Sequence, residues 1–467
     1  MKKHQDDMLG TMSIGKLLAK LSVPAMIGMF VNALYNVVDT IYIGRGVGPL
    51  AIGGLTISFP FQMIVMAIGM TIGVGAASVI SLNLGSGNRD KAYRAAGTAL
   101  STAVIIGIVM MIGGTIYLDQ ILFLFGASDT LIGYAREYLS VILIGIPFIS
   151  FTMTSNNIVR SEGKAVIAMV SMLLGTVLNI ILDPVFIFAL NMGIKGAAIA
   201  TVISQIISFS FLFFFFITGR SSLKIKLSHL IPDFHLLKEI TAIGLPAFVR
   251  QAGGSILAVI MNNVLIFYGG DLAVSAYGII NRLLMFTLMP LFGIVQGFQP
   301  IAGYNYGAKK FNRVQEAIKT SILATAVLST FSFLVMMFIP DILVKMFTTD
   351  KELITISVNA IRIVIIAIPL IGVQIVGATF FQSVGKAIPS LILGMSRQII
   401  FLIPLVLIIP HFLGLKGVWI AFPVADIGST VITFFWLLKE LKTLGLLHLK
   451  TVEPKEIRLI EEGIAAK

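Results

Sequence analysis

The chain has 467 residues, of which 57% are hydrophobic and 12% are charged, and its formal net charge is +12. This apolar fraction excludes a soluble globular protein and predicts a protein that lies in a lipid bilayer. The absence of cysteine excludes disulfides, thiol catalysis and zinc–thiolate sites. The segment Met1–Lys20 is polar and leads into an apolar span too long for a signal-peptide core, so no cleavable signal is expected.

In chain order, the apolar segments predict twelve membrane-spanning helices. Several exceed the ~20 residues that cross a ~30 Å hydrocarbon layer, so we expect tilt or extension beyond the bilayer. Most of the 34 lysines and arginines fall in segments on the same side as the N-terminus, which predicts that both termini are cytoplasmic. The basic charge then faces anionic lipid and requires no nucleic acid. The expected limits are 15–43, 50–84, 92–117, 133–157, 165–190, 196–219, 237–267, 275–305, 315–339, 353–382, 388–410 and 417–438.

The two halves of the chain repeat each other at an offset of 222 residues. Pro24 matches Pro246, and Asn83-Leu84-Gly85 matches Asn305-Tyr306-Gly307. Matching turn and kink residues at a fixed separation indicate duplication, and six spans per half give both halves the same orientation. The predicted fold is therefore an all-α polytopic membrane protein with two six-helix lobes around a central cavity. Its expected units are an N-terminal lobe (1–219), a cytoplasmic linker (220–236), a C-terminal lobe (237–442) and a cytoplasmic tail (443–467).

Four polar side chains of the first lobe are expected at one depth in the membrane. Asp183 lies inside an apolar run, where a charge costs roughly 3 kcal/mol, and Asn179 lies one turn earlier on the same face. Asp39 and Thr201 fall on the outer side of spans one and six. Taken singly, these residues have ordinary explanations: an ion pair, an exposed helix end, or a hydroxyl bonded to its own helix. Together they predict a coupling-ion site, because oxygen ligands suit Na⁺ and a buried carboxylate pair can hold H⁺.

Span one carries a polar stripe that leads to Asp39. Asn32, Tyr35 and Asn36 recur at helical spacing, so we expect them to support the ion site or to line the substrate cavity. The chain also has 21 methionines and 33 phenylalanines. Flexible thioethers and aromatic rings suit varied amphipathic organic cations, although both residue types also face lipid.

The second lobe lacks such a cluster, because the positions that match the first-lobe acids hold Met261 and Leu405. Its one intramembrane acid is Asp426, which we expect to form a structural ion pair with Arg282 or Arg362. No phosphate-binding loop, nucleotide motif or metal-ligand cluster is evident in the sequence. ATP-driven transport is therefore not expected, and no cofactor is expected beyond the coupling ion.

These features resemble the MATE (multidrug and toxic compound extrusion) family of transporters. The resemblance extends from about Ile14 to Leu438, and the motifs that carry it are Pro24, Val38-Asp39-Thr40 and Asn83-Leu84-Gly85-Ser86-Gly87. The first-lobe polar set is similar to the cation site of the DinF-like branch, which implies cation-coupled antiport with Tyr35 beside the site. The second-lobe acids of the NorM-like branch are missing, which argues against the second-lobe coupling of that branch. The resemblance leaves Na⁺ versus H⁺ open.

The sequence thus predicts a secondary antiporter of the plasma membrane. It would export organic cations or other amphipathic drugs in exchange for inward H⁺ or Na⁺, by alternating access of two lobes. A flippase for a lipid-linked headgroup, as in the wider superfamily, is the competing hypothesis; a receptor or channel is less expected. Such a protein is not an enzyme. Its expected partners are small amphipathic molecules and membrane lipid, with no obligatory protein partner.

Overall fold

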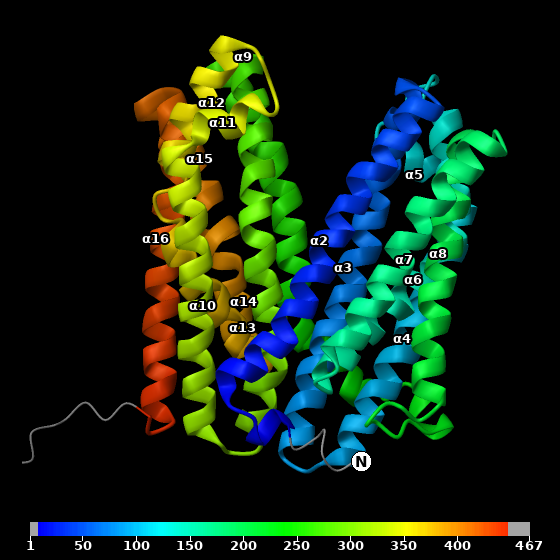
Figure 1. The fold of residues 1–467 in the computed structure, drawn as a ribbon, viewed down its shortest axis with the longest axis vertical. Helices are drawn as coiled ribbons and strands as arrows, with labels where there is room; N and C mark the ends of the chain where they lie inside the picture. The colour runs from blue at the N-terminus through cyan, green and yellow to red at the C-terminus, as the bar shows by residue number, and fades with distance from the viewer. Residues whose placement is uncertain (1–7, 447–467) are drawn as a thin grey trace, which may run out of the picture.

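The computed structural model describes residues 8–446, and at Asn32, Tyr35, Asn36, Val37, Gly44 and Pro49 it describes the backbone alone. Every regular element in this part of the chain is a helix. The helices form two bundles that meet at one end and diverge at the other (Figure 1). We call the closed end, which carries the connections at 86–88, 218–233 and 308–310, the base. The open end, which carries the connections at 47–48, 190–192 and 346–350, is the mouth.

The first lobe contains six spans, as predicted. A short helix at the mouth, α5 (Leu118–Leu124), was not predicted, and neither was the π-helical turn η1 (Val185–Ala189) that continues the fifth span. The spans are α2 (Ile14–Gly46), α3 (Pro49–Gly85), α4 (Arg89–Ile116), α6 (Ile132–Ser161), α7 (Ala165–Pro184) with η1, and α8 (Gly193–Ile217).

The second lobe begins with α9 (Phe234–Gly307), which supplies two spans because it turns back at Gly270, where φ is +64°. One later span is bent by 41°. Ten helices of the described residues are long and apolar enough to cross a membrane, and the bent pair adds an eleventh span. Because α9 supplies two spans, the described residues contain twelve. The remaining elements are α10 (Phe311–Phe338), α11 (Pro340–Lys345), the bent pair α12 (Lys351–Val364) and α13 (Ile371–Ser383) with η3 (Ile368–Leu370) between them, α14 (Ala387–Met395), η4 (Ser396–Leu402), α15 (Ile403–Ile408) and α16 (Pro410–Thr443).

The backbone repeats the symmetry of the sequence. Gly48 and Gly270, which are 222 residues apart, both have positive φ at the mouth, at +115° and +64°. Gly163 and Gly385, again 222 apart, have φ of +79° and +78°. Left-handed conformations are costly for residues other than glycine, so matching glycines at matching turns reflect one ancestral six-helix unit.

The linker between the lobes is held at the base by the buried side chain of Glu162. Its carboxylate accepts hydrogen bonds from Ser221 Oγ (2.7 Å) and from the Ser222 backbone nitrogen (2.6 Å). Lys164 Nζ lies 3.3 Å away. Burial raises the pKa of the Glu162 carboxyl, and the Lys164 charge opposes that shift. The linker contains a short 3₁₀ turn, η2 (Leu227–Leu230), and α9 then begins under an Asp233 cap.

The first helix connects the two lobes. α2 runs diagonally from the base to the mouth of the first lobe (Figure 1). Near the base, Leu17 and Leu21 pack into the same buried cluster as Phe298, Ile301 and Phe380 of the second lobe. Near the mouth, α2 packs within the first lobe. A movement of one lobe against the other must therefore involve α2.

The lobes approach to backbone contact at the base. A Cβ on Gly85 of α3 would overlap the carbonyl oxygen of Tyr304, and one on Gly307 of α9 would overlap that of Leu82. Both pairs are related by the 222-residue offset, so one contact occurs twice around a pseudo-two-fold axis. Small residues permit such close approach of membrane helices.

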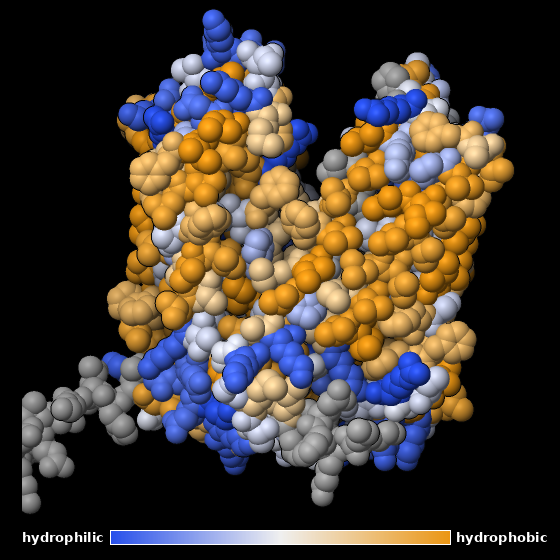
Figure 2. Space-filling model, viewed as in Figure 1, coloured by the Kyte–Doolittle hydropathy of each residue, from blue (hydrophilic) through white to orange (hydrophobic). Residues whose placement is uncertain are grey.

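The surface is hollowed between the lobes at the mouth, whereas the base is closed (Figure 2). Hydrophobic side chains form a broad belt around the middle, and hydrophilic side chains gather at both ends (Figure 2). This distribution fits a protein whose belt faces hydrocarbon and whose ends face water.

Candidate functional site

The structure brings four polar side chains of the first lobe together. Asp39 comes from the mouth-side part of α2, Asn179 and Asp183 from the last two turns of α7, and Thr201 from α8. All four are buried, and Asp183 is 0% exposed. Three helices thus contribute oxygen atoms to one enclosed cluster.

Asn179 links the members of this cluster. An amide orients according to its hydrogen-bond partners, and here its nitrogen faces Asp183 and its oxygen faces Thr201. In this orientation Asn179 Nδ2 donates to Asp183 Oδ2 at 2.9 Å. Its oxygen accepts from the backbone nitrogen of Thr201 at 3.2 Å and from the Thr201 hydroxyl at 3.1 Å. The amide therefore fixes Asp183 relative to α8.

Asp39 and Asp183 form a carboxyl pair. Their side chains lie within hydrogen-bonding reach of each other. Asp39 Oδ1 is buried and has no hydrogen-bond partner among the described residues. Two adjacent carboxylates repel each other when both are ionised, so a proton or a cation between them stabilises the pair. Chemically, the arrangement can hold one proton, or it can offer carboxylate, amide and hydroxyl oxygens to a small monovalent cation.

The local structure around Asp183 explains how α7 reaches α2. Pro184 follows the acid directly and ends the regular α-helix, after which η1 continues with the wider π-helical turn. The end of α2 lies against this turn: a Cβ on Gly46 would overlap Ile187, and the rings of Tyr42 and Phe188 meet edge-to-face at 6.3 Å. These contacts hold the two acid-bearing helices together.

The polar stripe expected below Asp39 cannot be compared with the structure. The side chains of Asn32, Tyr35 and Asn36 lie outside the described residues. Their backbone belongs to the continuous helix α2. Their assignment to the cavity or to the ion site stays a prediction.

The expected partners of Asp426 were wrong. Asp426 of α16 pairs with Arg397, whose Nε lies 2.6 Å from Oδ1. Arg397 belongs to η4, which packs against α16. The side chains of Arg282 and Arg362 are exposed. The depth of Asp426 in the membrane correctly indicated an ion pair. The direction in which each arginine points around its helix, which decides the partner, does not follow from the sequence.

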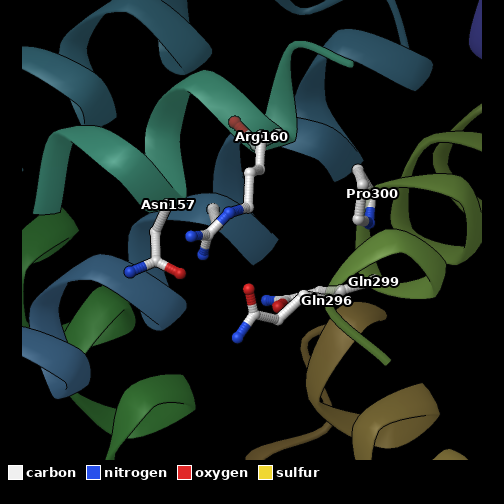
Figure 3. Close-up of a pocket in the computed structure, with 7 residues that line it drawn as sticks. Asn157, Arg160, Gln296, Gln299 and Pro300 are labelled. Carbon is white, nitrogen blue, oxygen red and sulfur yellow. The ribbon is translucent and has the colours of Figure 1, made fainter. Parts of the chain in front are cut away.

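A polar cluster between the lobes escaped the sequence analysis. Arg160 at the base end of α6 lies beside Asn157 and faces Gln296 and Gln299 of α9, around a cavity of about 10 Å³ (Figure 3). Basic residues are common at the cytoplasmic end of a span, so Arg160 does not stand out in the sequence. One feature of the sequence does distinguish Arg160: the matching position of the repeat is the uncharged Gln382.

The described residues contain no cluster of the side chains that usually bind divalent metal ions. No group of three or more His, Asp or Glu side chains in the described part of the chain is positioned to hold a metal ion.

Comparisons with known proteins agree with this architecture. A family model described as MatE matches residues 24–185 and again residues 246–408, so the two matches begin 222 residues apart. The multidrug export protein MepA of Staphylococcus haemolyticus is 26% identical over 423 residues, which cover 91% of this chain and 93% of that protein.

Solved structures give the same result. A MATE protein in complex with MaD3S superposes with a TM-score of 0.89 at 28% identity, covering 95% of this chain and 99% of the other. A multidrug resistance MATE transporter of the MOP superfamily, in an outward-facing conformation, superposes with a TM-score of 0.87 at 29% identity. That alignment covers 93% of this chain and 97% of the other.

Proposed function

This chain belongs to the MATE family of transporters, and we propose that it exports amphipathic drugs, organic cations among them, in exchange for inward H⁺ or Na⁺. The observation that carries the proposal is the buried Asp39–Asp183 pair with Asn179 and Thr201 beside it. The relative named as a multidrug export protein supports the substrate class. The resemblance of the cluster to the DinF-like branch supports cation coupling.

The coupling ion supplies the driving force in this proposal. One inward positive charge gains ~2.3 kcal/mol per 100 mV of membrane potential, which supports a nearly fiftyfold concentration gradient of an exported neutral species. An ion shifts a conformational equilibrium only if it binds one conformation better. The Asp39–Asp183 pair offers such a difference, because it joins α2 to α7 and α2 also packs on the second lobe.

We further propose that the base faces the cytoplasm and that this structure is open to the outside. The loops at the base are basic, which is the usual sign of a cytoplasmic face. The similarity to an outward-facing MATE transporter supports the same view. Because the chain has no cysteine, single cysteines can report sidedness. An impermeant maleimide should label Ser128→Cys at the mouth in intact cells, and Ser86→Cys at the base only after permeabilisation.

Transport in proteoliposomes tests the function directly. Purified protein is reconstituted, a sodium gradient or a proton gradient is imposed separately, and the movement of a cationic dye is followed. We expect one gradient to drive the dye and the dye to release the corresponding ion in exchange. Dye movement that ignores both gradients would contradict coupled antiport. Movement of a labelled lipid headgroup instead of the dye would support the flippase.

A further inference from the structure

Arg160 is a half-buried cation with no acidic partner among the described residues. It lies in the last turn of α6, and its guanidinium points into the space between α6 and the base-side part of α9 (Figure 3). Nε is buried without a hydrogen-bond partner, and Nη2 lies 3.4 Å from Met172 Sδ, a weak acceptor. None of the ion pairs in the described part of the chain, with nitrogen and oxygen within 4.0 Å, includes Arg160. A buried cation normally has a carboxylate or several strong acceptors.

The cavity beside Arg160 is built from both lobes. Asn157 and Arg160 line it from the first lobe, and Gln296, Gln299 and Pro300 line it from the second. The Gln296 side-chain oxygen is also buried without a partner. Gln299 is held in place by donating to Ser78 Oγ at 3.0 Å. At about 10 Å³ the cavity has room for roughly one water molecule while the base is closed.

The internal repeat shows that the fold itself does not require this charge. The position that matches Arg160 in the second lobe is Gln382, which is 3% exposed and donates to the carbonyl oxygen of Ile243 at 3.0 Å. A neutral side chain therefore packs and forms a hydrogen bond at the equivalent position of the second lobe. Partial burial of a guanidinium there has a desolvation cost that a glutamine avoids, so the charge has another reason to be present.

We propose that Arg160 binds an oxyanion, a carboxylate or phosphate group of the transported molecule, in the conformation in which the base is open. This inference rests on the proposed transport function and names the residue that would bind the anionic group of an amphipathic substrate. A guanidinium binds such groups in a bidentate manner. Because the cavity walls belong to different lobes, separation of the lobes at the base enlarges it and exposes Arg160. An oxyanion bound there favours the base-open conformation.

A matched pair of dyes tests this proposal. One xanthene dye carries a free carboxylate, and the other is the methyl ester of the same dye. Their affinity for the purified full-length protein is measured by fluorescence anisotropy, and their transport is measured in proteoliposomes of phosphatidylcholine and, separately, of phosphatidylglycerol. The proteins are wild type, Arg160→Gln, Arg160→Lys, and Arg136→Gln as a control from the mouth end of the same helix.

We expect Arg160→Gln to weaken binding of the carboxylate dye by about tenfold or more, the usual effect of losing a charged hydrogen-bond pair, and to leave the ester unchanged. Arg160→Lys should retain part of the affinity, and Arg136→Gln should match wild type. Equal affinities of wild type and Arg160→Gln for the carboxylate dye would overturn the proposal. Equal losses for both dyes that appear only in phosphatidylglycerol vesicles would assign the oxyanion to lipid instead. Failure of the wild type to transport either dye under either gradient would contradict the proposed function, and the binding measurement would still decide the role of Arg160.

Discussion

At the scale of single residues, Asp183 has the most constrained environment in the first-lobe cluster. It is 0% exposed and accepts a hydrogen bond from Asn179 at 2.9 Å. Asp183→Asn keeps the shape but removes the group that holds a proton or a cation. We expect coupled efflux to fall to the level of empty vesicles while expression and melting temperature stay near wild type. Asp119→Asn is the control, because Asp119 lies in an exposed pair with Arg136 at the mouth.

The expected loss at Asp183 has a clear contrary result. A well-expressed Asp183→Asn protein that drives dye efflux at the wild-type rate would show that this carboxylate does not couple transport. A protein that fails to reach the membrane would instead indicate a structural role, and thermal unfolding in detergent distinguishes the two results.

Asp39 is expected to act as one unit with Asp183. The two carboxyls lie within hydrogen-bonding reach, so they share one proton or one cation in the proposed mechanism. Asp39→Asn should abolish ion-driven uptake about as fully as Asp183→Asn, and the double variant should be scarcely worse than either single one. Groups that work together show such non-additivity, whereas independent sites add. Ion-driven uptake at matched expression checks this. Two partial losses that multiply in the double variant would contradict a shared site.

Sequence reasoning was sufficient to find the residues of this cluster but not their contacts. Asp39, Asn179, Asp183 and Thr201 were identified because polar side chains in apolar spans are few and their depth follows from topology. Which atoms meet depends on helix rotation. The π-helical turn after Pro184 alters that rotation, and no residue pattern in the sequence indicated it.

At the scale of elements, the second π-helical segment determines the ion pair of the other lobe. η4 carries Arg397, which packs toward α16 and pairs with Asp426 at 2.6 Å; their side chains are 19% and 3% exposed. Asp426→Asn leaves a buried cation, so we expect a loss of stability of about 3–5 kcal/mol with the ion dependence of transport unchanged. The melting temperature in detergent and proteoliposome transport measure these two effects.

A double variant provides the control for this pair. Arg397→Gln combined with Asp426→Asn removes both charges, so its stability should be closer to wild type than that of either single variant. If the stable double variant has a changed ion stoichiometry, the second lobe takes part in coupling and the structural assignment of Asp426 is wrong.

The spans themselves were predictable because each is a long apolar run closed by glycine or polar residues. The short helices α5 and α11 at the mouth were missed, because six or seven residues give too little periodicity to recognise. The pairing of Asp426 with Arg282 or Arg362 was wrong for a related reason. Within a span that is apolar on all sides, the sequence does not indicate which face meets a neighbouring helix.

At the scale of the whole molecule, the repeat places one close contact twice across the closed base. Gly85 meets the Tyr304 carbonyl, and Gly307 meets the Leu82 carbonyl, with no room for a Cβ in either place. Each added methyl group must push the opposing backbone away by more than about 1 Å to reach ordinary contact distance. Because the two contacts are equivalent, Gly85→Ala and Gly307→Ala should each favour separation of the lobes at the base.

We expect both alanine variants to shift the population toward the base-open conformation and to reduce efflux several-fold. Spin labels on the otherwise cysteine-free chain measure this: the distance between positions 86 and 312 at the base should lengthen, and that between 128 and 349 at the mouth should shorten. Gly113→Ala in α4 is the control, because a Cβ there meets nothing within 4 Å. Unchanged distances in both variants would show that the base closes through other contacts. A shift in only one variant would show that the two halves, although related by the repeat, do not contribute equally to closure.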